Sequence, residues 1–414
     1  MIESVAARMA KLGYVESALE DILQVRPFTF RRSIHQPAYR RRWRKHGPLG
    51  LAVAFFLLQE SLSLEELRQL LDDESIAALH MQGFLEPNRL GIRSKVDLYP
   101  CMGAYFFTDS AFELQPWPEQ VYWLGGDSYT LAYCTPRRAY SKALDLCSGS
   151  GIHALLAGCP ALGMDINARA IEFGRLNAAL NGISGVEFAQ GDCCEAAGRY
   201  DLVTLNPPFV PTPEGVAELY RTGGGSGEGV TERVVRKLAD WLRPGGLFSM
   251  ATEAPDGALQ RMRSWLGPGW GLAELKKFEF PIEDYIFSNI LSSATPPDQQ
   301  EAEYDRWLDS YEAFGIQKMV SAQYFAVRLA AGCADWQCSR EIPHPSGPQG
   351  EHWGKWLEAL NTWNSPWPED FVPRLREPER PGFSEQGKPL GQIEDRESLK
   401  ALGEQMLITH WNEK

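Results

Sequence analysis

The chain has 414 residues, of which 44% are hydrophobic and 23% are charged, and its formal net charge at pH 7 is −13. This length exceeds that of a single usual core, so we expect two or three structural units. The acidic balance argues against a protein that binds nucleic acid over its whole surface, and no apolar run reaches the roughly 20 residues of a membrane span.

Eight cysteines are scattered along the chain without a C-x-x-C pair. The first residues include Glu3 and Arg8 and lack a long apolar segment, so they do not predict a secretory signal. We therefore expect a cytoplasmic protein with reduced thiols and no membrane segment. Cys333 and Cys338 have no matching second pair, and no metal site is predicted.

Residues 1–118 are predicted to form a mainly helical first unit. Apolar residues at helical spacing indicate helices over 2–23, 49–58 and 76–81, and Ser63 and Glu66 have the spacing of a capping box at the start of a further helix. Residues 84–98 alternate like a hairpin around Asn88 and Gly91. This order resembles a winged-helix domain in pattern only, and we expect a substrate-recognition role.

A strongly basic stretch lies inside this acidic chain. No acid occurs between Asp21 and Glu60, whereas residues 26–45 hold eight Arg and Lys residues, including Arg40, Arg41 and Arg42. Such a run is either a solvated surface arm or a docking site for an acidic partner, a protein segment or a nucleic acid. We include these three arginines among the substrate-binding candidates.

Residues 119–331 are predicted to form an α/β unit. Short apolar runs at 143–146, 161–164, 186–189, 202–205 and 247–251 read as strands, and helical segments separate them at 152–156, 168–181 and 231–242. This alternation predicts a Rossmann-like parallel sheet with helices on both faces.

Residues 332–414 form the predicted C-terminal extension. This segment is rich in Pro, Gly and Trp, with a helix expected over 351–360. Five tryptophans are unlike a solvated tail, so we expect it to wrap back over the other units, by simple packing or near the substrate entrance.

Three acids follow three consecutive predicted strands. Asp145 precedes the turn Ser148-Gly149-Ser150-Gly151, which could also suit a nicotinamide dinucleotide, but a carboxylate there would repel a pyrophosphate and favour the positive charges of S-adenosylmethionine. Asp165 is placed to accept from ribose hydroxyls and Asp192 from the adenine amino group. We predict an S-adenosylmethionine site containing Asp145, Ser148, Gly149, Gly151, Asp165, Ile166, Asp192, Cys193 and Asn206.

The fourth predicted strand leads into Asn206-Pro207-Pro208-Phe209. Ligands bind at the carboxyl ends of parallel strands, and the Asn206 side-chain oxygen and the Pro207 carbonyl can both accept from one NH2 group. Phe209 can stack on a planar amide or base. We therefore predict Asn206, Pro207 and Phe209 as catalytic residues, with Pro208 and Phe209 in the substrate site.

Residues 119–255 resemble the class I methyltransferases that carry an N-P-P-[FY] motif. These include release-factor glutamine methyltransferases, adenine-N6 DNA methyltransferases and guanine-N2 methyltransferases of ribosomal RNA. The stretch 223–229 is similar to the G-G-x-D-G sequence of the release-factor enzymes but differs at Glu228 and by an extra glycine. Residues 125–128 resemble the segment that covers the cofactor in these proteins. The resemblance implies a Rossmann-like fold, S-adenosylmethionine and methylation of a planar nitrogen.

The methyl acceptor has three candidates. The first is a Gln or Asn side-chain amide of a protein or peptide, which the overall acidity and the glycine-rich stretch favour. The alternatives are an exocyclic amine of RNA or DNA, contacted through the basic arm, and a small-molecule amine. A cofactor-sensing regulator that does not catalyse is a further possibility, although an intact N-P-P-F motif argues against it.

Overall fold

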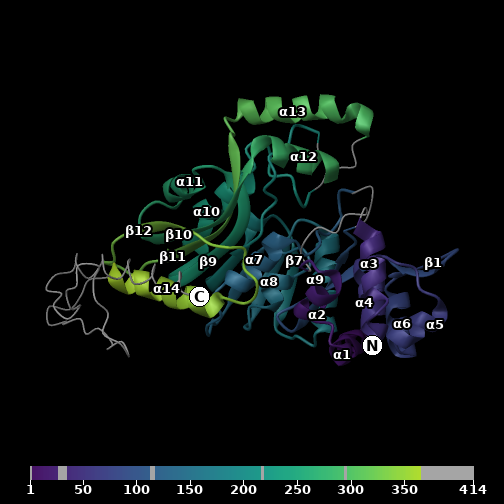
Figure 1. Cartoon of the computed structure of the whole chain (residues 1–414). Coiled ribbons are helices and arrows are strands. Elements are labelled where there is room, and N and C mark those ends of the chain that lie inside the picture. Colours follow the sequence, from purple (N-terminus) through teal and green to yellow (C-terminus); the bar gives the residue numbers. More distant parts are fainter. Residues whose placement is uncertain (1, 27–34, 112–116, 216–218, 293–295, 365–414) are drawn as a thin grey trace, which may run out of the picture.

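The computed structural model describes residues 2–26, 35–111, 117–215, 219–292 and 296–364 (Figure 1). Residues 365–414 of the predicted C-terminal extension, including Trp367, therefore lie outside the described residues, as does part of the basic arm, including Arg31 and Arg32. None of the helices within these ranges combines the length and apolarity needed to cross a bilayer.

Six helices open the chain. They are α1 (Glu3–Leu12), α2 (Glu16–Leu23), α3 (Gln36–Trp43), α4 (Gly47–Leu57), α5 (Leu64–Leu70) and α6 (Asp73–Met81). The single helix predicted over 2–23 is wrong, because Gly13 adopts a left-handed conformation (φ 71°) that ends α1 and starts a new helix after Val15. The capping box is confirmed: the Ser63 side chain accepts from the Glu66 N–H, and the Glu66 side chain accepts from the Ser63 N–H.

Two hairpins follow the helices. The expected one consists of β1 (Leu85–Asn88) and β2 (Gly91–Ser94), and a second, unpredicted one consists of β3 (Val96–Cys101) and β4 (Ala104–Asp109). β4 docks on α9 (Ala168–Leu180), because the Asn177 side chain donates to the Phe107 carbonyl and accepts from its N–H, at 2.9 and 2.8 Å. Arg169 pairs with buried Asp109 at 2.5 Å. The first unit is thereby fastened to the α/β unit.

The central sheet has eight strands in the order β12-β10-β11-β9-β8-β5-β6-β7. All five predicted strands are confirmed. The strands are β5 (Ala143–Leu146), β6 (Ala161–Asp165), β7 (Val186–Gln190), β8 (Tyr200–Leu205), β9 (Leu242–Pro255), β10 (Trp270–Pro281), β11 (Lys318–Arg328) and β12 (Trp336–Glu341). The five predicted strands pair in parallel, as expected, whereas the unpredicted β11 runs antiparallel to both β9 and β10.

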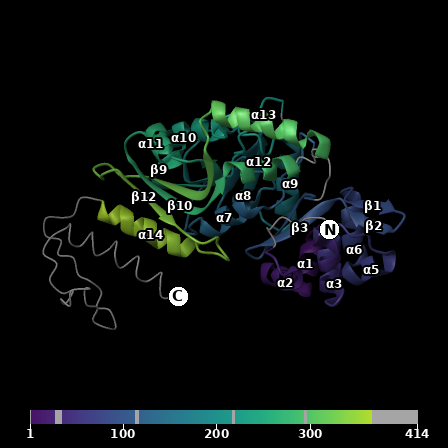
Figure 2. The same ribbon diagram turned by 45° about the horizontal axis from the view of Figure 1, so that its top comes forward.

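Helices cover both faces of this sheet, as predicted (Figures 1 and 2). Buried side chains of α7 and α9 pack in one hydrophobic cluster, and those of α10 and α11 pack in another on the opposite face. The remaining helices are α7 (Gly126–Cys134), α8 (Ile152–Leu155), α10 (Gly229–Trp241), α11 (Ala258–Leu266), α12 (Ile282–Ser292), α13 (Gln300–Ala313) and α14 (Gly350–Trp363). In Figure 1, α12 and α13 stand above the rest of the molecule.

The described part of the C-terminal extension is packed. β12 pairs in parallel with β10 at the edge of the sheet, and Trp336 donates from Nε1 to Asn361 of α14 at 3.0 Å. Trp353 is 1% exposed and Trp356 is 4% exposed, both within the cluster that α7 and α9 share. These three tryptophans serve packing, the first of the two expectations.

One aromatic ring explains three glycines. A Cβ at Gly151, Gly163 or Gly174 would lie 2.6–2.8 Å from ring atoms of Phe188 in β7. Gly151 precedes α8, Gly163 lies in β6 and Gly174 lies in α9. These elements pack so closely around the Phe188 ring that an added methyl group has no room.

We expect Gly174→Ala to lower the free energy of unfolding by about 1–3 kcal/mol, the usual cost of overpacking a filled core. Gly347→Ala should change it little, because no atom lies within 4 Å of the added Cβ. Urea unfolding followed by circular dichroism measures both variants. Equal stability of the two would contradict the packing around Phe188.

Candidate active site

The predicted site residues meet at one edge of the sheet. β5, β6, β7 and β8 are parallel neighbours, so the segments after their carboxyl ends lie together. Asp145 lies within β5, Asp165 ends β6, and Asn206 directly follows β8. The structure therefore brings together side chains that are up to about sixty positions apart in the sequence.

Asp145 supports the glycine turn through hydrogen bonds. Its Oδ2 accepts from the Ser148 hydroxyl at 2.6 Å and from the Ala154 N–H at 3.2 Å, while its Oδ1 accepts from Thr204 at 2.8 Å. Burial raises the Asp145 pKa to about 7, although these hydrogen bonds oppose the shift. Both oxygens are already engaged, so Asp145 shapes the turn rather than presenting an open carboxylate.

The turn itself approaches the next acid. Gly149 and Gly151 have left-handed φ values of 52° and 81°, which favour glycine. The Gly149 N–H donates to Asp165 Oδ2 at 2.8 Å, and the Asn167 N–H donates to Asp165 Oδ1 at 2.9 Å. Burial raises the pKa of Asp165, and these bonds oppose that shift. Next to it, the apolar side chain of Ile166 is 60% exposed.

The third acid, Asp192, follows β7. Its Oδ2 pairs with Arg233 of α10 at 2.5 Å, and its Oδ1 accepts from the Cys194 N–H at 2.8 Å. Arg233 and this N–H hold the Asp192 pKa at about 2, so the carboxylate is ionised at neutral pH. Cys193 is buried beside it. The ion pair with Arg233 was not predicted from the sequence.

Asn206 is held in one orientation. Its Nδ2 donates to Asp127 Oδ2 at 2.7 Å and to the Ser128 hydroxyl at 3.3 Å, so its Oδ1 is buried without a hydrogen-bond partner in the described residues. The other Asp127 oxygen accepts from Tyr122 at 3.0 Å, and the Tyr122 ring stacks on Tyr220. An unpaired buried carbonyl oxygen is costly, and it marks a place where a donor can bind.

The segment after Asn206 is tied to the glycine-rich stretch. The Val210 N–H donates to the Arg221 carbonyl, and the Gly223 N–H donates to the Val210 carbonyl, both at 2.9 Å. Gly227 has φ 74°, and a Cβ there would lie 2.5 Å from the Phe209 carbonyl oxygen. The glycines at 223–229 thus let the two loops touch.

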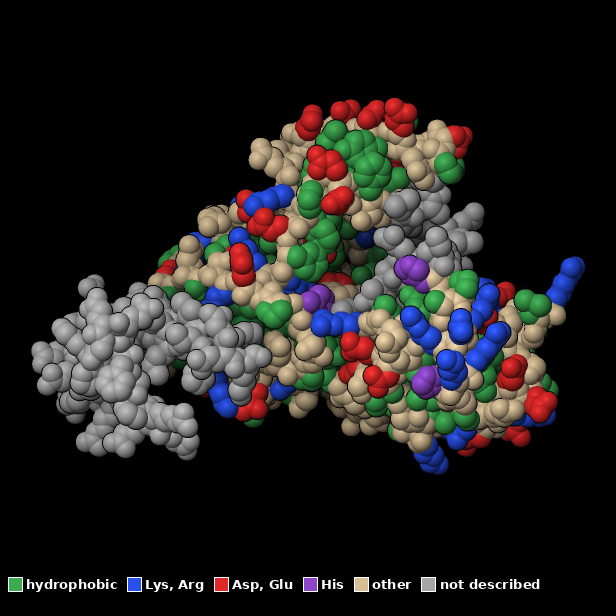
Figure 3. All heavy atoms as spheres, in the orientation of Figure 1, with side chains coloured by type: hydrophobic (Ala, Val, Ile, Leu, Met, Phe, Trp, Pro, Cys, Tyr) green, Lys and Arg blue, Asp and Glu red, His purple; other side chains and the backbone are tan. Residues whose placement is uncertain are grey.

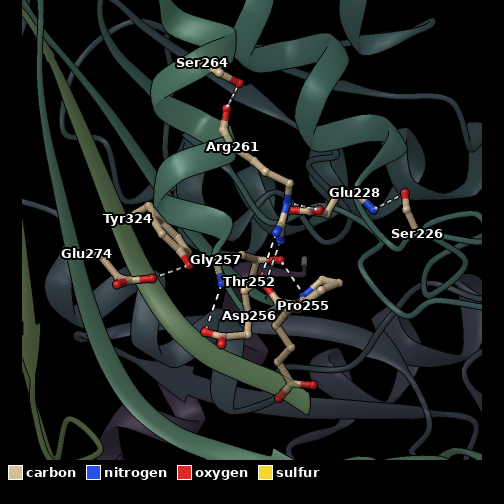
Figure 4. Close-up of polar contacts among 11 residues, drawn as sticks. Ser226, Glu228, Thr252, Pro255, Asp256, Gly257, Arg261, Ser264, Glu274 and Tyr324 are labelled. Carbon is tan, nitrogen blue, oxygen red and sulfur yellow. Dashed lines mark hydrogen bonds and ion pairs between the residues drawn. The ribbon is translucent and has the colours of Figure 1, made fainter. Parts of the chain in front are cut away.

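Glu228, where the stretch departs from the release-factor pattern, forms an ion pair. Its carboxylate accepts from Arg261 of α11 at 2.7 Å, and the same guanidinium donates to the Pro255 and Asp256 carbonyls, as Figure 4 shows. Burial raises the Glu228 pKa and Arg261 lowers it. This contact joins the end of the glycine-rich stretch to the end of β9.

Helices α12 and α13 cap the loop. Phe209 and Val210 pack in one cluster with side chains of both helices, and the Tyr311 hydroxyl donates to the Pro211 carbonyl at 2.9 Å. Neither helix was predicted from the sequence. The loop after β8 is therefore covered by an insertion that separates β10 from β11 in the chain.

The three predicted arginines of α3 lie in the helical unit and do not join this cluster in the described residues. Arg40 pairs with Glu60 at 2.5 Å, and Arg42 donates to the Leu23 carbonyl at 2.6 Å, while Arg41 is exposed. Basic side chains gather over this unit in Figure 3, whereas acidic ones line α13. The substrate role of the arginines remains a prediction.

Two residues near Asn206 were missed. Asp127 stands in the segment resembling the cofactor cover, but its bond to Asn206 was not foreseen. Glu253 lies near the end of β9, which pairs with β8. An acid near the end of a fifth predicted strand was the sequence signal that could have identified it.

Comparison with known proteins agrees with this geometry. Residues 127–280 match the family model described as "Methyltransferase small domain". These residues therefore resemble a methyltransferase domain. The match starts at Asp127 and includes the three acids, the N-P-P-F loop and the end of β10.

Three curated relatives match part of the domain. A putative protein N5-glutamine methyltransferase of Methanocaldococcus jannaschii is 25% identical over 31% of this chain and 68% of its own length. The ribosomal protein uL3 glutamine methyltransferase of Bradyrhizobium diazoefficiens is 33% identical, over 30% of this chain and 44% of its own length. Ribosomal RNA small subunit methyltransferase C of Salmonella arizonae is 35% identical over 20% of this chain and 26% of its own length. The chain thus spans less than half the length of the latter two.

The residues at this edge fit S-adenosylmethionine. The glycine turn leaves open space around Gly149, Asp165 keeps acceptor capacity, and exposed Ile166 offers an apolar surface for an adenine ring. Asn206 Oδ1 supplies an unpaired acceptor directly after β8.

Asp127→Ala should reduce the rate of methyl transfer on the order of 100-fold, because Asn206 would no longer be oriented. Ser128→Ala is the matched control, and we expect a smaller loss because its contact with Asn206 is longer, at 3.3 Å. Turnover with labelled donor measures both. An Asp127→Ala enzyme as active as Ser128→Ala would exclude the orienting role.

Proposed function

We propose that the chain methylates a side-chain amide, of Gln or Asn, in a protein or peptide. The observation that carries this proposal is the arrangement of Asn206, whose amino group is bound by Asp127 and whose Oδ1 is buried and unpaired. An amide NH2 of an acceptor supplies the missing donor. Two of the relatives are named as glutamine methyltransferases, which supports the same acceptor.

The chemistry follows from orientation. Asn206 Oδ1 and the Pro207 carbonyl accept the two N–H groups, Pro208 and Phe209 contact the planar amide, and the nitrogen lone pair then faces the methyl group. An amide nitrogen is weakly basic, so proximity and alignment supply most of the rate. S-adenosylmethionine supplies an electrophilic methyl group when bound.

We assign the cofactor contacts to the edge residues. Asp165 accepts from the ribose hydroxyls, Asp192 and Cys193 face the adenine, and Ile166 packs on its ring. Ser148, Gly149 and Gly151 form the turn against which the methionine part lies, with Asp145 supporting that turn. We place the reaction in the cytoplasm.

An exocyclic amine of RNA is the second candidate. One relative is named as a ribosomal RNA methyltransferase, and the exposed Arg41 and Arg44 could contact phosphates. The net charge of −13 weighs against it. We propose that residues 1–118 recognise the substrate and that the basic arm binds an acidic segment of the protein acceptor.

Labelling distinguishes the acceptors. Incubating cell extract with the enzyme and radiolabelled donor should give label that protease, and not nuclease, releases as small fragments. Asn206→Ala should reduce this labelling on the order of 100-fold or more, while Asn364→Ala at the C-terminal end of α14 should not. Release by nuclease would overturn the amide assignment, and near wild-type activity of Asn206→Ala would overturn its catalytic role.

The basic arm gives a separate test. Arg41→Ala combined with Arg44→Ala should weaken acceptor binding about tenfold, because these exposed arginines have no ion pair in the described residues. Arg68→Ala, which removes an exposed arginine from α5, is the control. The KM for the acceptor reports the effect, and an unchanged KM would leave the arm a solvated surface.

A further inference from the structure

A second polar group lies beside Asn206. β8 and β9 are parallel neighbours, with Leu205 aligned on Met250, so Asn206 and Glu253 follow the same edge of the sheet. Asp127 connects them: it accepts from Asn206 at 2.7 Å, and its charge raises the pKa of Glu253. The two side chains thus belong to one site.

Glu253 is the acid of this site that is least engaged by the protein. Asp127 is bonded on both oxygens, whereas Glu253 has no ion pair in the described part of the chain. A hydrogen bond from Tyr285 of α12, which is 3% exposed, is among the causes that lower the pKa of Glu253, although the Tyr285 hydroxyl lies outside ideal hydrogen-bond geometry. The Glu253 carboxylate and the Tyr285 hydroxyl can therefore bind an additional partner.

The charges around Glu253 suit a group that gains and loses a proton. Burial raises its pKa to about 7, Lys277 lowers it and Asp127 raises it further. Lys277 of β10 is itself buried and donates to Thr130 at 3.0 Å. Burial and the charge of Glu253 raise the pKa of Tyr122, Tyr285 and Tyr311, so these tyrosines stay neutral near pH 7.

We propose that Glu253 is a catalytic residue that accepts the proton which the acceptor nitrogen loses during methyl transfer. The inference rests on the proposed N-methylation. The nitrogen lone pair forms a bond to the methyl carbon, the carbon–sulfur bond breaks, and its electron pair remains on sulfur. The nitrogen then carries an excess proton, which moves to the Glu253 carboxylate and forms a neutral acid, later deprotonated by water.

This role complements Asn206. An amide nitrogen needs no base before the reaction, but its N–H becomes strongly acidic as the new bond forms, and a nearby acceptor with a pKa near neutral is well matched to take it. Lys277 lowers the pKa of Glu253 and so favours the ionised carboxylate, to which Tyr285 can donate. Asn206 Oδ1 and the Pro207 carbonyl thus bind the two N–H groups before the reaction, and the Glu253 carboxylate takes the proton that leaves as the new bond forms.

The test is the pH profile of methyl transfer to the labelled acceptor fraction. In the wild-type enzyme, kcat should fall about tenfold per pH unit below pH 7 and level off above it. Glu253→Gln should lower the plateau by about 100-fold or more and remove this limb, and Glu253→Asp should recover part of the rate. Glu279→Gln, the same change on exposed β10, is the control.

Donor affinity, measured by calorimetry, should be the same in the wild-type enzyme and in Glu253→Gln. A Glu253→Gln enzyme that keeps the rate of Glu279→Gln, or that keeps the acidic limb, would overturn the proposal. Persistence of the limb would assign it to another group, of which Asp145, with its pKa raised to about 7, is the first choice. Equal loss of donor affinity and rate would also overturn it, since the variant would then have lost its fold.

A second measurement needs no acceptor. Infrared difference spectra between the wild-type protein and Glu253→Gln should show a protonated carboxyl band that titrates near pH 7, and Lys277→Met should move its midpoint upward. A midpoint near the ordinary value of 4.5 would contradict the proposed proton acceptor. If the label instead resides on RNA, the amide assignment fails while the Glu253 results stand on their own.

Discussion

The hydrogen bond from Asn206 to Asp127 sets the chemistry of this site. A side-chain amide can present either its oxygen or its nitrogen, and only one choice makes the site an acceptor of N–H groups. Asp127 binds the nitrogen, and Tyr122 holds Asp127, so the oxygen faces the opposite way. Because Asp127 comes from α7, before the first strand of the sheet, the orientation of Asn206 depends on a residue 79 positions upstream.

The rest of the fold keeps this loop from moving. The glycine-rich stretch binds the backbone at Val210, Glu228 joins that stretch to Arg261, and α12 and α13 pack on the loop from above. Each contact comes from a different element. The elements along the carboxyl edge of the sheet thus together hold the loop that is proposed to align the weakly basic nitrogen. Catalysis by alignment requires such rigidity.

The sequence predicted what local pattern determines. Five strands, the capping box at Ser63 and the three acids were evident, because apolar runs and turn residues report their own surroundings. The antiparallel β11, the β3–β4 hairpin and the α12–α13 cap were missed, since their positions depend on partners remote in sequence. Within the site, residue types were predicted, but pairings such as Asp127 with Asn206 and Arg233 with Asp192 required three dimensions.

The edge strand β12 has a consequence for the chain's solubility. It shields one side of β10, whose backbone would otherwise present unpaired N–H and C=O groups along a long strand. An enzyme shortened before Trp336 would keep every residue of the catalytic edge and yet expose a template for strand addition. Such a protein would self-associate through this edge. β12 thus protects the chain against aggregation, and this role is separate from the chemistry of the site.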